Sequence, residues 1–500
     1  MSTLADALRA SLEAADFTVD AVLDRIGDAG QAALGRNSTV ASLVALGDAD
    51  DALATLTRLW PLQQEVPSAA VRRVLPVDRL LDAGLLEPAP GDHLRASVDV
   101  RPYGSADDGA SGWVVSDLTP GLDQRMTPTR PDYVLGVSPA STTLAQLTMR
   151  APVASALDLG TGCGVQTLHL ARHARRIVAT DLNPRALTLA RLTLALNRVD
   201  ADLREGSLYE PVAGERFDLI VTNPPFVMSP PRPDAERLTY REGSFAGDGL
   251  MHAVVSGAAD HLTPGGSLQV LGNWAITDDE PWEERVASWA PPGCDLWVIE
   301  RERLDVFAYI EMWLTDAGLA TSPDWLTRYA EWLDYFGSLG ITGVGMGWLT
   351  VTRAQRDAPD ITIESWPYAV EQPVGSAIAA RQAAVSLASE SDAGLLARHF
   401  AVADHVTQET LGRPGYADPE HIVLRSSAGL RRAMEVDTAL GGVLGACDGD
   451  MSLEQIVGGV AHLLEVDKAT LVGATLPHVR QAIRDGLLLD TDIPGLTYPD

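Results

Sequence analysis

The spacing of apolar residues divides the chain into three stretches with different predicted structures. Up to about residue 90, apolar residues recur every three or four positions, as in "TLADALRASLEAADF" and "DDALATLTRLW", which predicts amphipathic helices. The segment "PVDRLLDAGLL" predicts one more helix, and "HLRASVDVRPYG" after it predicts a short alternating strand. This order indicates a helical, winged-helix-like N-terminal domain over residues 1–125, which we expect to recognise the substrate.

Between about residues 126 and 355, continuous apolar runs alternate with helical periodicity. The runs "ASALDLG", "RIVATDL", "FDLIVTN" and "GSLQVLGNW" predict buried strands, and "CDLWVIE" and "VGMGWLTVTR" predict two more. Helices are predicted between them, among them "VQTLHLARHA", "PRALTLARLTLALNRV" and "HAVVSGAADHL". Strands alternating with helices are typical of a doubly wound, Rossmann-like α/β sheet with parallel strands.

The pattern changes again after residue 356. "ITIESWPYAV" predicts a strand, "SAIAARQAAVSLAS" a helix, and the stretch that ends in "VRQAIRDGLLL" a second winged-helix-like fold. We therefore expect a C-terminal α+β domain over residues 356–500. Winged-helix folds bind nucleic acid in many proteins and only mediate packing in others, so its role stays open.

Composition narrows the classes of partner. The formal net charge is −30, and a uniformly acidic surface repels phosphate backbones, so a nucleic-acid substrate would need a local basic patch. Of the 38 basic residues only Lys468 is a lysine. The three cysteines have no pair motif or metal-ligand spacing, and there is no signal peptide or membrane-spanning run. We expect a cytoplasmic protein with no metal site.

A glycine-rich loop follows the first buried strand, in "LDLGTGCG". Gly160, Gly162 and Gly164 permit a tight turn and let the backbone approach a ligand closely, with Thr161 between the first two. Such a loop alone fits nicotinamide and flavin sites as well as a bare turn. Asp158 inside the motif would repel a pyrophosphate, which favours a cationic ligand without phosphate, such as S-adenosylmethionine.

The second strand ends in Asp181, followed by Leu182 in "VATDLNP". A carboxylate there can accept hydrogen bonds from two ribose hydroxyls. It can equally cap the helix that begins at "NPRALTL", because acidic groups favour helix starts. On the residues alone, both interpretations stand.

With these motifs, residues 130 to 355 resemble the class I S-adenosylmethionine-dependent methyltransferases, within them the HemK-type and small-domain N-methyltransferases. "LDLGTGCG" resembles the first motif of that family, Asp181 its ribose-binding acid and "NPPF" its fourth motif. The resemblance implies a seven-stranded sheet, S-adenosylmethionine as cofactor, and an adenine border at Gly206, Ser207 and Leu208. Ser207 departs from the family, which usually has an acidic residue there.

The motif "NPPF" follows the strand "FDLIVT" and consists of Asn223, Pro224, Pro225 and Phe226. The lone pair of a planar NH2 group is delocalised, so the nitrogen attacks a methyl sulfonium poorly. The Asn223 side-chain oxygen and the Pro224 carbonyl can accept its two N–H bonds, and the prolines hold these acceptors in place. Phe226 can stack on a flat substrate. The alternative is a rigid turn after an edge strand.

Two neighbouring segments are also candidates for the site. "SPASTTLAQL" before the first strand is either a segment over the cofactor or a helix capped by Ser or Thr. Arg241 and Glu242, in "LTYREGSFAGDGLM", either border the substrate or lie in a solvated loop.

The sequence thus predicts an N-methyltransferase whose first candidate substrate is an exocyclic amine of adenine or guanine in RNA or DNA. The alternative is a glutamine amide of a release-factor-type protein, for which acidic flanks suit a basic partner. A non-catalytic cofactor-binding scaffold is a minor alternative. The sequence does not indicate an oligomeric state.

Overall fold

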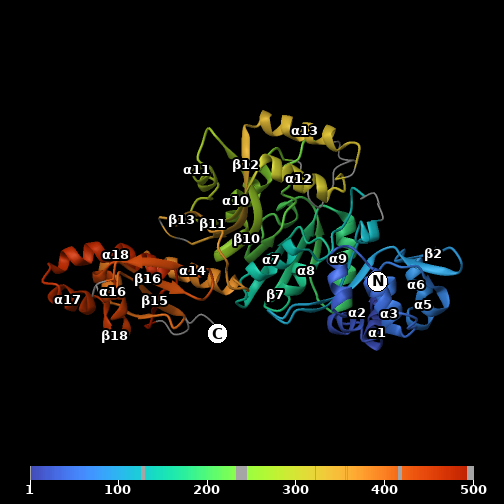
Figure 1. Ribbon diagram of the computed structural model, residues 1–500, viewed down its shortest axis with the longest axis horizontal. Coiled ribbons are helices and arrows are strands. Elements are labelled where there is room, and N and C mark those ends of the chain that lie inside the picture. Colours follow the sequence, from blue (N-terminus) through green and yellow to red (C-terminus); the bar gives the residue numbers. More distant parts are fainter. Residues whose placement is uncertain are drawn as a thin grey trace. The chain divides into compact units, whose positions relative to one another are not determined.

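The computed structural model describes residues 2–124, 130–231, 245–320, 322–354, 356, 358–414 and 419–492 (Figure 1). The chain forms two compact units. Unit 1 holds Met1–Ala145 with Pro152–Pro367, and unit 2 holds Gln146–Ala151 with Tyr368–Asp500. The division into three domains stays a prediction, and each unit is described by itself.

An eight-stranded sheet dominates unit 1, in the order β13-β11-β12-β10-β9-β6-β7-β8. Its middle strands are parallel, and β12 lies antiparallel between β10 and β11. The doubly wound α/β class is therefore confirmed. The strands are β6 (Val153–Leu159), β7 (Ala174–Asp181), β8 (Asp202–Glu205), β9 (Phe217–Thr222), β10 (Leu262–Thr277), β11 (Asp295–Asp305), β12 (Ile341–Thr352) and β13 (Ile361–Ser365).

The eighth strand is a difference from the seven that the resemblance implied. β13 belongs to "ITIESWPYAV", which we expected in the C-terminal domain, yet it pairs in parallel with β11. β11 would otherwise end the sheet with unpaired backbone groups, and β13 covers that edge. The sheet thus runs about ten residues beyond the predicted boundary at 355.

Helices follow the strands as the apolar pattern predicted. Proline stands in the first turn of α9 and Asn183 caps it, its side chain accepting from the Arg185 backbone N–H at 2.9 Å. The helices and short 3₁₀ turns of this region are η1 (Leu122–Gln124), α7 (Pro139–Leu147), α8 (Val165–Leu170), α9 (Pro184–Asn197), η2 (Glu210–Val212), α10 (Gly249–His261), α11 (Trp282–Ala287), α12 (Val306–Asp316) and α13 (Trp325–Ser338).

The N-terminal segment of unit 1 consists of helices, a small antiparallel sheet and a hairpin. It comprises α1 (Ser2–Ala14), α2 (Val19–Leu34), α3 (Val40–Leu46), α4 (Ala52–Leu59), α5 (Ser68–Val74), α6 (Val77–Asp82), β1 (Val66–Pro67), β2 (Leu86–Ala89), β3 (His93–Ala96) and the β4–β5 hairpin (Asp99–Gly104, Ser111–Ser116). Leu8 and Leu12 of α1 share one apolar core with Leu189 and Leu192 of α9. This segment therefore packs on the sheet through α9.

Polar contacts hold the β4–β5 hairpin against α8 and α9. The Asn197 amide of α9 accepts from the Trp113 N–H at 2.9 Å and donates to the Trp113 carbonyl at 2.7 Å. Gly112 makes this approach possible, because a β-carbon there would lie 1.6 Å from the Asn197 oxygen. On α8, buried His169 contacts the Tyr103 hydroxyl at 2.6 Å and the Asp108 carboxylate at 2.7 Å.

Unit 2 contains two three-stranded sheets with helices. Its elements are α14 (Gly375–Ala388), α15 (Asp392–Ala397), β14 (His399–Val402), β15 (Val406–Leu411), β16 (His421–Ser426), β17 (Ala433–Val436), α16 (Thr438–Gly445), β18 (Asp448–Ser452), α17 (Leu453–Leu463), α18 (Lys468–Arg484) and β19 (Leu488–Asp490). The order β18-α17-α18-β19 repeats the order β1-α5-α6-β2 of the N-terminal segment. The winged-helix-like description of both segments stays a prediction.

Candidate functional site

A cleft opens at the carboxyl ends of β6, β7 and β9 and encloses about 1350 Å³, part of it open to solvent. The predicted motifs meet there because the carboxyl ends of parallel strands share one edge of a sheet. Its lining residues are Tyr133, Val134, Leu135, Gly136, Ser141, Asp158, Leu159, Gly160, Thr161, Gly162, Cys163, Val165, Gln166, Thr180, Asp181, Leu182, Asn183, Ala186, Gly206, Ser207, Leu208, Thr222, Asn223, Pro224, Pro225, Phe245 and Leu250.

The glycine loop forms the turn between β6 and α8. The N–H groups of Gly160 and Thr161 donate to the Thr180 carbonyl at 2.9 and 2.8 Å, which fastens the loop to β7. Gly160, Gly162 and Gly164 have φ of 78°, 56° and 86°, a region that favours glycine. Gly164 does not line the cleft: a β-carbon there would lie 3.4 Å from Ala190, so this glycine lets α8 approach α9.

Asp158 lies at the base of the cleft and is 1% exposed. Its Oδ2 accepts hydrogen bonds from the Thr161 hydroxyl at 2.7 Å and the Thr167 hydroxyl at 2.6 Å. Burial raises the pKa of this carboxyl from 3.8 to about 6, and the nearby Asp181 also acts in that direction. Near neutral pH it is therefore a buried anion beside the glycine loop, suited to a cationic ligand.

Asp181 ends β7 and connects three segments of the cleft wall. Its carboxylate accepts from the Gly162 N–H at 2.9 Å and the Asn183 N–H at 2.8 Å, and its carbonyl from the Gly206 N–H at 3.1 Å. Burial raises its pKa. The side chain that caps α9 is that of Asn183, so Asp181 is available to the cleft.

The predicted adenine border also lies in the cleft wall. Gly206 has φ 152°, and a β-carbon there would lie 2.5 Å from Pro211, so the tight turn after β8 requires glycine. Leu208 has φ 46°, and Ser207 stands between these two residues in the lining. Leu182 is exposed at the cleft mouth.

The segment after β9 places an unpaired acceptor in the cleft. The Thr222 hydroxyl donates to the Leu159 carbonyl at 2.7 Å and so fixes the end of β9 against β6. Asn223 Oδ1 is buried and has no hydrogen-bond partner among the described residues. A buried polar atom without a partner is costly, and Asn223 is one of the residues that line the cleft.

Phe226 does not line the cleft, in contrast to the predicted stacking on substrate. Its ring packs edge-on against Trp313 of α12, with centroids 6.3 Å apart. Two residues later, the Met228 N–H donates to the Tyr309 hydroxyl at 3.1 Å, and Asn273 Nδ2 donates to the same hydroxyl at 2.8 Å. The segment after Pro225 is thus anchored by α12 and β10.

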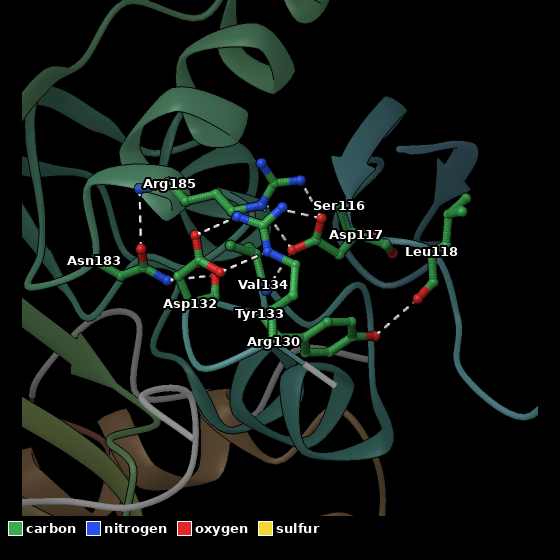
Figure 2. A network of polar contacts seen from close by, with 9 residues as sticks. All are labelled: Ser116, Asp117, Leu118, Arg130, Asp132, Tyr133, Val134, Asn183 and Arg185. Atoms are coloured by element: carbon green, nitrogen blue, oxygen red, sulfur yellow. Dashed lines mark hydrogen bonds and ion pairs between the residues drawn. The ribbon is translucent and has the colours of Figure 1, made fainter. Parts of the chain in front are cut away.

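A polar network fastens the segment before α7 to the cleft (Figure 2). The Val134 N–H donates to Asp117 Oδ2 at 2.8 Å, and Asn183 Nδ2 donates to the Asp132 carbonyl at 2.9 Å. Arg185 forms an ion pair with Asp117, which raises the pKa of the guanidinium. Residues 133–136 therefore form a cleft wall that the network holds against α9 and β5.

For "SPASTTLAQL", the structure shows a serine contact of the capping kind, and a position over the cofactor stays a prediction. Ser138 Oγ accepts from the Ser141 N–H at 3.2 Å near the start of α7, while Ser141 lines the cleft and its carbonyl accepts from Gln166 Nε2 at 2.7 Å. Arg241 and Glu242 lie outside the described residues.

Several cleft residues had no assigned role in the sequence analysis, among them Tyr133, Gln166 and Asn183. Gln166 carried a usable signal, since it is a polar residue on an otherwise buried helix, and Asn183 carried another, since it directly precedes the proline that begins α9. Tyr133 had none, because it lies in an irregular segment without periodicity.

Other features of the described residues bear on the class of site. All three cysteines are buried, and burial raises the pKa of Cys163, which lines the cleft, to about 12, so its thiol is a poor nucleophile. A search of the described residues finds no cluster of His, Cys, Asp or Glu that could hold a metal ion. None of the described helices has the length and apolar run needed to span a membrane.

Comparison with protein families assigns the central segment. Residues 136–284 match the methyltransferase small domain, which contains the glycine loop, Asp181 and "NPPF". Residues 14–97 match a domain of unknown function (DUF7059), and residues 379–490 match another (DUF7782). The predicted resemblance to methyltransferases is confirmed.

Similar curated proteins fall into two groups. A release factor glutamine methyltransferase from Geobacter sulfurreducens is 36% identical over 132 residues, 24% of this chain and 46% of that protein. A ribosomal RNA small subunit methyltransferase C from Erwinia tasmaniensis is 31% identical over 119 residues, 23% of this chain and 30% of that protein. The chain spans less than half the length of these relatives.

Among solved structures, a Thermus thermophilus 16S rRNA N2 G1207 methyltransferase, in complex with AdoMet and guanosine, is 19% identical, with a TM-score of 0.26. That match covers 52% of this chain and 67% of the other. A methyltransferase from Pyrococcus furiosus is 15% identical, with a TM-score of 0.27, and covers 44% and 88%.

Proposed function

Because residues 136–284 form a methyltransferase small domain, we propose that this protein transfers a methyl group from S-adenosylmethionine to a planar NH2 nitrogen. The cofactor would occupy the cleft of unit 1. Asp181 would hold the ribose hydroxyls, Asp158 would attract the amino group and sulfonium, and residues 206–208 would border the adenine. The chemistry that this cofactor supplies is an activated methyl group.

The observation that carries the proposal is the buried Asn223 Oδ1, which has no partner among the described residues. An NH2 group placed there would donate one N–H to this oxygen and the other to the Pro224 carbonyl. Both acceptors lie on a segment fixed by Thr222 and two prolines, so little reorganisation precedes reaction. Positioning of this kind supplies about 7–11 kcal/mol in the best intramolecular systems.

The reaction balances without an assigned general base. The nitrogen lone pair forms the N–C bond while the C–S bond breaks, and the sulfur keeps that electron pair. The methylated nitrogen is then positively charged and acidic, and it loses one proton to water. Asn223 accepts hydrogen bonds throughout and takes no proton itself.

For the substrate, we place an exocyclic amine of a nucleobase first and a protein glutamine amide second. Relatives of both kinds match 22–24% of the chain, the ribosomal RNA methyltransferases at 31–32% identity and the release factor glutamine methyltransferases at 36–42%. Phe226 packs edge-on against Trp313 and does not line the cleft, which weakens the stacking argument for a base, and the charge of −30 suits a basic protein. Three exposed arginines of unit 1 that form no ion pair among the described residues, Arg172, Arg175 and Arg198, support a nucleic-acid substrate.

The test is transfer of tritiated methyl from S-adenosylmethionine into extract from a strain that lacks this protein. Label lost on nuclease treatment would support the nucleobase, and label lost only to protease would support glutamine and overturn the first choice. Asn223→Ala should lower kcat at least a thousandfold while cofactor Kd changes less than threefold. Asp181→Ala should instead raise cofactor Kd at least tenfold. Full activity in Asn223→Ala would refute the mechanism.

A further inference from the structure

A second, polar groove lies at the amino end of β7, whereas the cleft lies at its carboxyl end. It encloses about 770 Å³ between the β4–β5 loop, the end of α8, the start of β7 and the end of α9. Its lining residues are Gly109, Ala110, Ser111, Leu168, Ala171, Arg172, Ala174, Arg175, Ile177, Asn197, Arg198, Val199 and Asp200. We call it the arginine groove, after Arg172, Arg175 and Arg198.

These three arginines are exposed, and their guanidinium groups have no ion pair or hydrogen bond among the described residues. Elsewhere, described arginines commonly pair with a carboxylate, as neighbouring Arg176 does with Glu215. In a chain with net charge −30, carboxylates are abundant, so three uncompensated arginines on one groove are a local positive field. The lining contains one opposing carboxylate, Asp200.

The wall beside Arg172 is backbone. The Arg172 Nη2 lies 3.7 Å from the position that a β-carbon at Gly109 would take, and Gly109 has φ 68°. A guanidinium presents a planar fork of N–H donors that matches a phosphate oxygen pair. Three such groups on one groove suit a ligand with several anionic groups, such as a phosphodiester backbone, better than a single carboxylate.

We propose that the arginine groove binds the phosphodiester backbone of a nucleic-acid substrate, which rests on the proposed methyl transfer to a nucleobase. The groove lies at the start of β7 and Asp181 at its end. Seven residue steps of about 3.3 Å separate them by about 23 Å. Because β7 is buried, a ligand that reaches both sites must run over the surface and cover at least that distance, which several nucleotides do and a single nucleoside does not.

The test measures binding of a fluorescent 30-nucleotide RNA stem-loop to the full chain without S-adenosylmethionine. In Arg172→Glu/Arg175→Glu, we expect Kd to rise at least tenfold at 100 mM salt. The slope of log K against log salt should fall by about 1.5, because each phosphate contact contributes about 0.7–0.9. The control Arg36→Glu/Arg431→Glu changes the charge equally at unpaired arginines outside the groove and should alter Kd less than twofold.

Further arms identify the ligand. DNA of the same sequence carries the same phosphodiester and should show the same dependence on the groove. AMP should compete only at concentrations at least a hundredfold above RNA; equal competition would overturn the choice of a polymer. Polyglutamate that binds as tightly, with the same loss in the groove variant, would overturn phosphate recognition. Unchanged RNA affinity in the groove variant would overturn the proposal.

The proposal of methyl transfer and the proposal of RNA binding in the arginine groove can be contradicted independently of each other. Asn223→Ala should lose transfer but keep the slope of log K against log salt for RNA binding, since Asn223 is not in the groove and contacts no phosphate there. The groove variant should still methylate a saturating substrate, with KM raised and kcat changed less than threefold. Loss of transfer with intact RNA binding would count against the methyl-transfer chemistry alone.

Discussion

Arg185 donates to both carboxylate oxygens of Asp117, with Nε 3.1 Å from Oδ1 and 3.0 Å from Oδ2. Arg185 lies in the first turn of α9, and Asp117 follows β5. Their side chains are 25% and 8% exposed. Since Asp117 also accepts from the Val134 N–H, one carboxylate joins the N-terminal segment, α9 and the cleft wall.

Removal of this carboxylate should loosen the wall. In Asp117→Ala, the Val134 N–H loses its partner and Arg185 keeps only its attraction to Asp132, which together cost about 2–4 kcal/mol. We expect faster amide hydrogen exchange over residues 130–136 and at least a fivefold rise in cofactor Kd. The control Glu87→Ala breaks the exposed Arg95–Glu87 pair and should cost less than about 1 kcal/mol. Unchanged exchange at Val134 would contradict the role of Asp117.

Cofactor affinity should depend on pH through Asp158. An ordinary aspartate ionises near pH 3.8, whereas burial moves the pKa of Asp158 to about 6. Between these values the folded state binds more protons than the unfolded state, so this group's contribution to stability falls as pH rises through the window. The ionised form attracts the cationic cofactor, so affinity should rise over the same window.

Titration calorimetry between pH 5 and 7.5 checks this expectation. We expect cofactor Kd to fall about fivefold to tenfold across the range, as the buried carboxyl ionises. Asp158→Asn should bind more weakly at pH 7.5 and flatten the change centred near pH 6. The exposed substitution Asp78→Asn should leave the profile unchanged. An equally steep profile in Asp158→Asn would assign the titration to another group.

The Tyr309 hydroxyl should matter for turnover without contacting substrate. Tyr309→Phe removes the acceptor for the Met228 N–H and Asn273 Nδ2, both buried, at a cost of about 1–3 kcal/mol. Because Met228 follows the "NPPF" segment closely, we expect kcat to fall about tenfold with cofactor Kd unchanged. Tyr329→Phe, which removes a more exposed hydroxyl bonded to Glu311 at 3.1 Å, is the matched control. Equal kcat in both variants would show that Tyr309 only stabilises the fold.

The sequence predicted those site residues that end strands. Asp158, Asp181 and Asn223 each close or follow an apolar run, and a parallel sheet brings such positions to one edge. Tyr133 and Val134 could not be found this way, because distant partners such as Asp117 hold them in place. The contact of Phe226 with Trp313 could not be predicted either, because Trp313 comes from a helix that begins 80 residues later; the stacking of Phe226 on substrate stays a prediction.

The sheet edge and the charge distribution show a second limit of sequence reasoning. "ITIES" predicted a strand, but only the open edge of β11 decides which sheet it joins. Likewise, the net charge of −30 describes the chain as a whole, and pairing in three dimensions decides which arginines stay uncompensated. Arg172 and Arg198 are 26 positions apart in sequence and line the same groove.

The segment that matches the methyltransferase small domain shares an apolar core with α1, which lies outside the match. A chain cut at residue 136 would leave Leu189 and Leu192 facing water. It would also remove the Trp113 backbone groups that Asn197 contacts. The N-terminal segment of unit 1 therefore covers apolar surface of α9 that would otherwise be exposed. The residues that match the methyltransferase small domain therefore begin at position 136, whereas the apolar core that they share begins in α1.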